Sequence, residues 1–220
     1  MIRKRLNFES KKAKAAFLEA HLGFNASKLT GNPGDGVVVG FISRLPGEGV
    51  STTVTGLARS LGALSPGSIL IIDANPTGTR IAKLLESGAK NPLTSASFDR
   101  MDFSILNHLE TIENGDLALI TIDYETSENY CLSAEFGQYL VDLREHYDTI
   151  LVDIGSWDQL APVYWADFMD HLVLIIDSER TTRESLEDFK HKLDRSGHEL
   201  SGFILNKQER PVPEFIYRSL

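Results

Sequence analysis

The stretch VVVGFISRLPGEGVSTTVTGLARSLGAL, residues 37–64, contains an apolar run, a glycine-rich turn and a helix-like segment in that order. The run VVVGFIS is apolar and rich in β-branched residues, which predicts a buried strand. Gly47 and Gly49 allow backbone amides to approach an anion closely, and a helix start directs its unpaired N–H groups to the same place. We therefore predict a strand, a phosphate-binding loop and a helix.

Further short apolar runs follow along the chain, with helix-like stretches between them. Continuous apolar runs of this kind suit strands that are buried on both faces of a parallel sheet. We predict a P-loop NTPase-like (Rossmann-like) α/β fold, with a mostly parallel sheet flanked by helices on both faces. The runs are SILIID from Ser68, LALITI from Leu117, TILVDI from Thr149, LVLIID from Leu172 and GFILN from Gly202.

The segments between these strands divide into helices and loops. Thr181 to Glu184 is the pattern of a capping box, ahead of a helix that stops near Gly197. A second helix is predicted through QYLVDLREHY, residues 138–147. Residues 88–102 are rich in Ser, Asn, Gly and Pro, which predicts a surface loop. We expect residues 1–35 to form an N-terminal helical arm and residues 36–220 to form one P-loop domain.

Composition limits the classes of function. The formal net charge of -9 and the pI near 5.2 disfavour nucleic acid as a partner, because phosphate binding needs a basic face. Cys131 is the single cysteine and has no partner for an intramolecular disulfide. The chain lacks an apolar run long enough to cross a bilayer, and its first residues lack the pattern of a secretory signal. We expect a cytoplasmic protein with no transmembrane segment.

The loop departs from the standard phosphate-binding pattern at one position. Ser51 occupies the place of the hydroxyl that reaches Mg²⁺, but Val50 stands where the pattern has lysine. Because phosphoryl transfer depends on positioning and charge stabilisation, losing that cation should cost on the order of a few kcal/mol in the transition state. Binding should survive better than turnover. The alternative is a glycine-rich turn that only joins a strand to a helix.

Taken together, these segments resemble the cytoplasmic domain of bacterial tyrosine kinases (BY-kinases), relatives of the MinD/ParA ATPases. The resemblance extends from about Gly36 to Lys207. A second family motif, an apolar run followed by D-x-D, is matched by Asp73, with Asn75 in place of the second carboxylate. The third motif, an aspartate after an apolar strand, is matched by Asp153. The family loop S-x-x-P-G-E-G-K-S is matched at Ser43, Pro46, Gly47, Glu48, Gly49 and Ser51.

The resemblance implies ATP or ADP with Mg²⁺ as ligands. It gives Asp73 and Asp153 catalytic roles, and it makes Ser51 and Asp153 the metal ligands. An aspartate at a strand end is otherwise often a helix cap or a loop anchor. Asn206 would contact the adenine base, or it would instead satisfy a loop backbone. The nucleotide-binding residues implied in this way are Arg44, Pro46, Gly47, Glu48, Gly49, Val50, Ser51, Thr52 and Asn206.

Two arginines lie near the motifs and are candidates to replace the missing cation. Arg44 belongs to the loop, and Arg80 follows the second motif. A guanidinium can contact phosphate oxygens through two hydrogen bonds. We hypothesise that Arg44 partly compensates for Val50.

The resemblance implies a role in exopolysaccharide or capsule biosynthesis and export. With the departures at Val50 and Asn75, we predict a degenerate, kinase-like accessory or regulatory factor with weak or absent catalysis. Its partner would be a membrane polysaccharide co-polymerase or assembly protein that holds it at the inner membrane. The alternatives are an active tyrosine autokinase that modifies Tyr217, and a MinD/ParA-like positioning or secretion factor that dimerises on ATP.

Overall fold

The structure is a computed structural model of the 220-residue chain. It describes residues 36–64, 68–76, 80–88, 91–98, 103–112, 115–123, 134–157 and 161–207. The arm predicted for residues 1–35, and Tyr217 in the C-terminal segment, lie outside the described residues. Within the described ranges, no helix combines the length and the apolar character that crossing a membrane requires.

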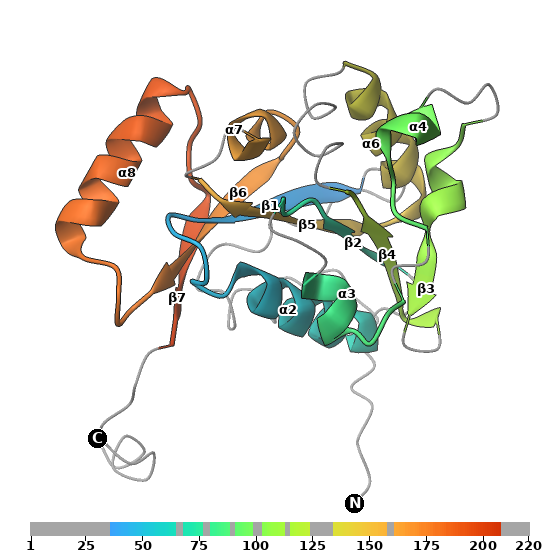
Figure 1. The fold of residues 1–220 in the computed structure, drawn as a ribbon, viewed down its shortest axis with the longest axis horizontal. Coiled ribbons are helices and arrows are strands. Elements are labelled where there is room, and N and C mark those ends of the chain that lie inside the picture. The colour runs from blue at the N-terminus through green and yellow to red at the C-terminus, as the bar shows by residue number, and fades with distance from the viewer. Residues whose placement is uncertain are drawn as a thin grey trace, which may run out of the picture.

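A seven-stranded sheet forms the centre of the fold, in the order β3-β4-β2-β5-β1-β6-β7 (Figure 1). All neighbouring strands are parallel except β3 and β4. The predicted α/β fold with a mostly parallel sheet is therefore confirmed. The strands are β1 (Val37–Ser43), β2 (Ile69–Asp73), β3 (Glu110–Ile112), β4 (Leu117–Thr121), β5 (Thr149–Ser156), β6 (His171–Asp177) and β7 (Gly202–Asn206).

Helices cover both faces of the sheet, as Figure 1 shows. On one face lie α2 (Val50–Leu64) and α3 (Arg80–Leu84), which bury one apolar cluster against the strands. On the other face α6 (Ala134–His146), α7 (Ala161–Ala166) and α8 (Arg183–Arg195) bury a second cluster. The central strands are buried along their whole length and mostly apolar, because both of their faces are covered in this way.

Two local features of the fold differ from the sequence analysis. The short antiparallel strand β3 was not predicted, since its three residues carry no pattern long enough to detect. The predicted surface loop 88–102 contains the short helix α4 (Ser95–Phe98), and its Leu93 is fully buried in a bridge to Ile122. The polar composition of this segment did not indicate that one apolar residue, Leu93, is buried. After this loop comes a 3-10 helix, Ile105–His108.

The cap of α8 lies one residue later than predicted. The N-cap is Thr182, whose side chain accepts a hydrogen bond from the Ser185 amide. The Thr181 hydroxyl donates instead to the carboxylate of Glu48 in the phosphate-loop region. A tertiary partner therefore takes the hydroxyl that the local pattern assigned to the helix. Gly197 follows the helix with a φ of 82°, as its stop signal predicts.

The carboxyl ends of the parallel strands gather the polar residues of the fold. Ser43 ends β1, Asp73 ends β2 and Asp177 ends β6. Asp153 lies opposite Asp73 in the register of β5 and β2. In open parallel sheets ligands bind outside these strand ends, so this edge is where a site is expected.

Candidate nucleotide-binding site

The loop between β1 and α2 has the backbone conformation that its glycines allow. Gly47 has a φ of 82° and Gly49 a φ of 102°, both in the left-handed region that favours glycine. A Cβ on Gly49 would lie 2.0 Å from the Asn206 amide nitrogen, so no larger residue fits there. The loop passes directly into the 15-residue helix α2. This is the predicted strand, loop and helix, with the helix start facing the loop.

The Glu48 side chain holds the loop from inside. It is fully buried, and one carboxylate oxygen accepts hydrogen bonds from the amides of Arg44 at 2.8 Å and Leu45 at 2.9 Å. The other oxygen accepts from the Thr181 hydroxyl. Glu48 therefore shapes the loop and links it to the start of α8. Because its oxygens are occupied by these donors, its contribution to a ligand comes through the backbone.

Two side chains at the end of β7 support the loop from outside. The Asn206 amide donates to the Glu48 carbonyl at 2.8 Å, and the Lys207 ammonium donates to the Gly47 carbonyl at 2.9 Å. Lys207 also donates to Asp177 at 2.7 Å. Of the two roles considered for Asn206, the structure places its amide nitrogen on the loop backbone. Lys207 was missed because nothing in its local sequence indicates a partner 160 residues away.

A small cavity of about 50 Å³ opens between the loop and the ends of β2 and β5. Val50, an apolar residue in the position of the usual lysine, contributes to its lining and also belongs to the buried apolar cluster beside α2. Arg80 is the one cationic side chain among the ten residues that line the cavity. The lining residues are Ser43, Pro46, Gly47, Gly49, Val50, Ser51, Asn75, Arg80, Gly155 and Ser156.

The other predicted loop residues lie differently. The Arg44 guanidinium points to α8, where its Nε donates to the Ser185 carbonyl at 3.1 Å. It lies near Asp188, whose pKa it helps to lower after the larger effects of Lys192. Thr52, in the first turn of α2, is exposed to solvent. Of the two candidate arginines, only Arg80 lines the cavity.

Two buried aspartates face each other behind the cavity. Burial, followed by the nearby charge of Asp153, raises the pKa of Asp73 to about 8. Burial also raises the pKa of Asp153 to about 6, against the lowering effects of the Ser51 hydroxyl, the Asn75 amide, the Gly155 amide and the Arg80 charge. Asn75 Nδ2 donates to Asp153 Oδ1 at 3.3 Å. Two adjacent carboxyl groups in such a site do not both ionise readily without a cation.

These carboxyl groups keep unused oxygen atoms. Among the described residues, Asp73 Oδ1 and Asp153 Oδ2 are buried and have no hydrogen-bond partner. A buried oxygen of this kind is costly unless something coordinates it. The Ser51 hydroxyl lies against Asp153, and hydroxyl and carboxylate oxygens are the ligands that Mg²⁺ prefers. Ser51, Asp153 and Asp73 thus fit a magnesium ion shared with phosphate oxygens. The described ranges contain no group of three or more His, Cys, Asp or Glu side chains that could hold a metal ion, so the site offers two carboxyl groups and one hydroxyl.

Comparison with solved structures finds the same fold in kinase domains and in MinD. The kinase domain of VpsO is similar over 89% of this chain and 92% of its own, with 25% identity and a TM-score of 0.71. The kinase domain of the Escherichia coli tyrosine kinase ETK is similar over 82% and 72%, with 16% identity and a TM-score of 0.63. MinD from Pyrococcus horikoshii, complexed with Mg-ADP, is similar over 83% and 76%, with 18% identity and a TM-score of 0.62.

No protein-family model matches the sequence, and no curated protein matches it by sequence. The structural neighbours include BY-kinase domains and MinD/ParA ATPases. The chain therefore has the P-loop fold of this superfamily, and the resemblance predicted from its sequence motifs is confirmed at the level of structure.

Proposed function

We propose that this chain is a kinase-like, nucleotide-binding accessory protein in exopolysaccharide or capsule biosynthesis and export, with weak or absent phosphoryl transfer. One observation carries the proposal. The loop keeps the backbone geometry of an anion cradle, with Ser51 and Asp153 beside it, while the apolar Val50 lines the cavity in the position where the standard loop supplies an ammonium. The chain retains what holds a magnesium nucleotide and lacks a group that stabilises the reacting phosphate.

The free-energy cost of the missing lysine supports nucleotide binding without efficient phosphoryl transfer. Backbone donors and the helix dipole favour phosphate in the ground state and do not depend on the residue at position 50. The transition state carries more charge on its equatorial oxygens, and losing a directed cation there costs on the order of a few kcal/mol. Asn75 adds a second defect, because its amide is directed at Asp153 and cannot act as a base. Ser51 and Asp153 would hold a bound Mg²⁺, which would supply positive charge to the phosphates.

A regulatory role also suits the way the loop is tied to the rest of the fold. Glu48 joins the loop to Thr181, and Arg44 joins it to Ser185, so the loop contacts the start of α8 in two places. A nucleotide that shifts the loop would shift this helix as well. We propose that the partner is a membrane polysaccharide co-polymerase or assembly protein. The chain would act at the cytoplasmic face of the inner membrane, through that partner and without nucleic acid.

Titration calorimetry with ATP and Mg²⁺ on the full chain tests nucleotide binding directly. We expect saturable binding and a rise in melting temperature, because a ligand of the folded state stabilises it. Radiolabel from γ-labelled ATP should stay in the nucleotide. Transfer to Tyr217 would favour an active autokinase, and nucleotide-dependent dimerisation without transfer would favour a MinD/ParA-like factor. Failure to bind any nucleotide would overturn the proposal.

A further inference from the structure

We propose that Arg80 supplies the phosphate-contacting positive charge that Val50 removes from the loop. This inference rests on the proposed nucleotide binding and assigns a phosphate contact to a residue outside the standard motif. The first observation is position. Arg80 lines the cavity together with Gly47, Gly49 and Ser51, the part of the loop whose amides would cradle phosphate. Its charge therefore lies beside the space that the nucleotide's phosphates would fill.

The second observation is the way Arg80 is placed. It is the first residue of α3, and the amide of its neighbour Ile81 donates to Asp73 Oδ2 at 3.3 Å. This bond ties the start of α3 to the end of β2, so the aspartate of the second motif also positions the arginine. The guanidinium lies close enough to Asp153 that its charge helps to lower the pKa of that carboxyl group.

The third observation is availability. Within the described residues, no hydrogen bond or ion pair to another side chain fixes the Arg80 guanidinium, and the residue is exposed. Of the other cations near the loop, Arg180 has its Nη1 3.7 Å from the place that a Cβ on Gly47 would take, but it does not line the cavity. Two more are already bonded. Lys207 is bonded to Asp177 and the Gly47 carbonyl, and Arg44 is bonded to α8. Among these described cations, Arg80 is the one that lines the cavity and can turn to a phosphate without breaking a side-chain hydrogen bond.

Arg80 should act on the terminal phosphates. The cavity lies between the loop and the ends of β2 and β5, where Asn75 and Gly155 also lie. A polyphosphate held by the loop amides would direct its end toward this wall. A guanidinium can form two parallel hydrogen bonds to phosphate oxygens, and charge-assisted bonds of this type are about twice as strong as neutral ones. ATP should therefore depend on Arg80 more than AMP does.

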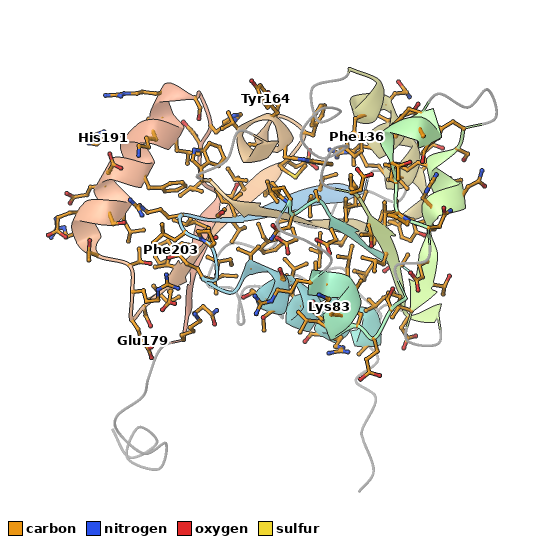
Figure 2. The ribbon with its side chains drawn as sticks, viewed as in Figure 1. Lys83, Phe136, Tyr164, Glu179, His191 and Phe203 are labelled. Atoms are coloured by element: carbon orange, nitrogen blue, oxygen red, sulfur yellow. The ribbon has the colours of Figure 1, made fainter. Side chains whose placement is uncertain are left out.

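Calorimetry of the full chain with ATP, ADP and AMP, each with Mg²⁺, tests this assignment. Arg80→Gln should weaken ATP binding by about 10- to 100-fold and AMP binding by less than about twofold. Arg80→Lys keeps the charge and should lose less. Lys83→Gln is the matched control, because Lys83 is an exposed cation on the same helix and lies outside the cavity lining (Figure 2). This control should leave all three affinities unchanged.

A second experiment introduces the lysine of the standard loop at position 50 and measures Arg80→Gln in that background. In a Val50→Lys chain, Arg80→Gln should cost less than about threefold in ATP affinity, because the two cations would serve the same phosphates. An equal cost in both backgrounds would overturn the assignment, as would an equal loss of ATP and AMP binding. If the unchanged chain binds ATP and the Arg80→Gln variant binds it equally tightly, only this inference fails. If the unchanged chain binds no nucleotide, the proposed function fails with it.

Discussion

Two regions at the same edge of the sheet bury aspartates in opposite ways. At the ends of β6 and β7, the fully buried Asp177 accepts a hydrogen bond from Lys207 at 2.7 Å, which lowers its pKa. At the ends of β2 and β5, Asp73 and Asp153 face each other, and their pKa values are raised. The first region is internally satisfied and supports the loop. The second keeps unpartnered oxygens beside a cavity. Burial alone does not mark a ligand site, but burial without a counter-charge does.

Neutralising one aspartate in each region should change the free energy of unfolding in opposite directions, and this is the largest effect that we expect. In metal-free buffer at pH 8, Asp73→Asn should raise the free energy of unfolding by about 2 to 4 kcal/mol, because it removes the cost of burying a charge beside Asp153. Asp177→Asn should lower it, because the Lys207 ammonium loses its acceptor. Urea denaturation of both variants and the unchanged chain measures this. If both substitutions changed the free energy of unfolding in the same direction, the contrast between the two regions would be contradicted.

The two regions should also contribute oppositely to the pH dependence of stability. Asp73 and Asp153 have pKa values of about 8 and about 6 in the folded chain, against an ordinary 3.8 when unfolded. Above pH 4 the folded chain therefore holds protons that the unfolded chain has released. Their contribution is fully present below pH 3.8 and is lost as pH rises through about 6 and then about 8. Asp177 acts oppositely, since its lowered pKa gives stability that is lost only on acidification.

Metal-free stability should therefore fall by about 2 to 4 kcal/mol between pH 5 and pH 8. Urea titrations in EDTA at several pH values, at constant ionic strength, measure the slope. Asp73→Asn should flatten it. At pH 8, Mg²⁺ at about 100 times its dissociation constant should restore about 2.7 kcal/mol. A slope that stays flat in the unchanged chain would contradict the raised pKa values.

A cation added to the unsatisfied region should strengthen ligand binding. Val50→Lys should raise ATP affinity by about 10-fold or more, because its ammonium would enter the cavity that Val50 now lines. Phosphate transfer should gain little, since Asn75 still replaces the second carboxylate. Calorimetry and a radiolabel assay on the same preparation separate the two effects. Val50→Met is the control, because the methionine side chain is similar in bulk to lysine but carries no charge.

A cation removed from the satisfied region should have the smallest effect. Arg44→Ala should change ATP affinity by less than about twofold, because its guanidinium donates to the Ser185 carbonyl outside the cavity. The free energy of unfolding should fall by about 1 kcal/mol or less, the size of one partly exposed hydrogen bond. Calorimetry and urea denaturation measure the two quantities. A large loss of affinity would restore the hypothesis that Arg44 compensates for Val50.

The motifs themselves were predictable from the sequence because each is local. The glycines of the loop, the apolar strands and Ser51 at the start of α2 follow from neighbouring residues alone. The capping box was one residue off, because Thr181 is taken by Glu48 across the fold. The polar segment 88–102 concealed Leu93, whose burial depends on a bridge to Ile122. Local patterns fail where a distant partner changes the outcome.

The aromatic residues after the third motif show the same limit. Trp157 and Trp165 could have formed either a core or an exposed contact surface, and the structure buries both against α6 and α8. The sequence contains their apolar area but not the identity of what covers it. That depends on which helices cross the sheet above β5.

The sequence by itself determined the α/β class, the position of the anion cradle and the absence of its lysine, because these features lie within short contiguous segments. Only the tertiary structure decided which charges meet. The strand order brings Asp73 of β2 beside Asp153 of β5, and it brings Lys207 to Asp177 and to the loop. It also turns Arg44 toward α8 and leaves Arg80 at the cavity. Electrostatic partners are set by distance in space, and residues far apart in the chain meet only when the sheet has formed.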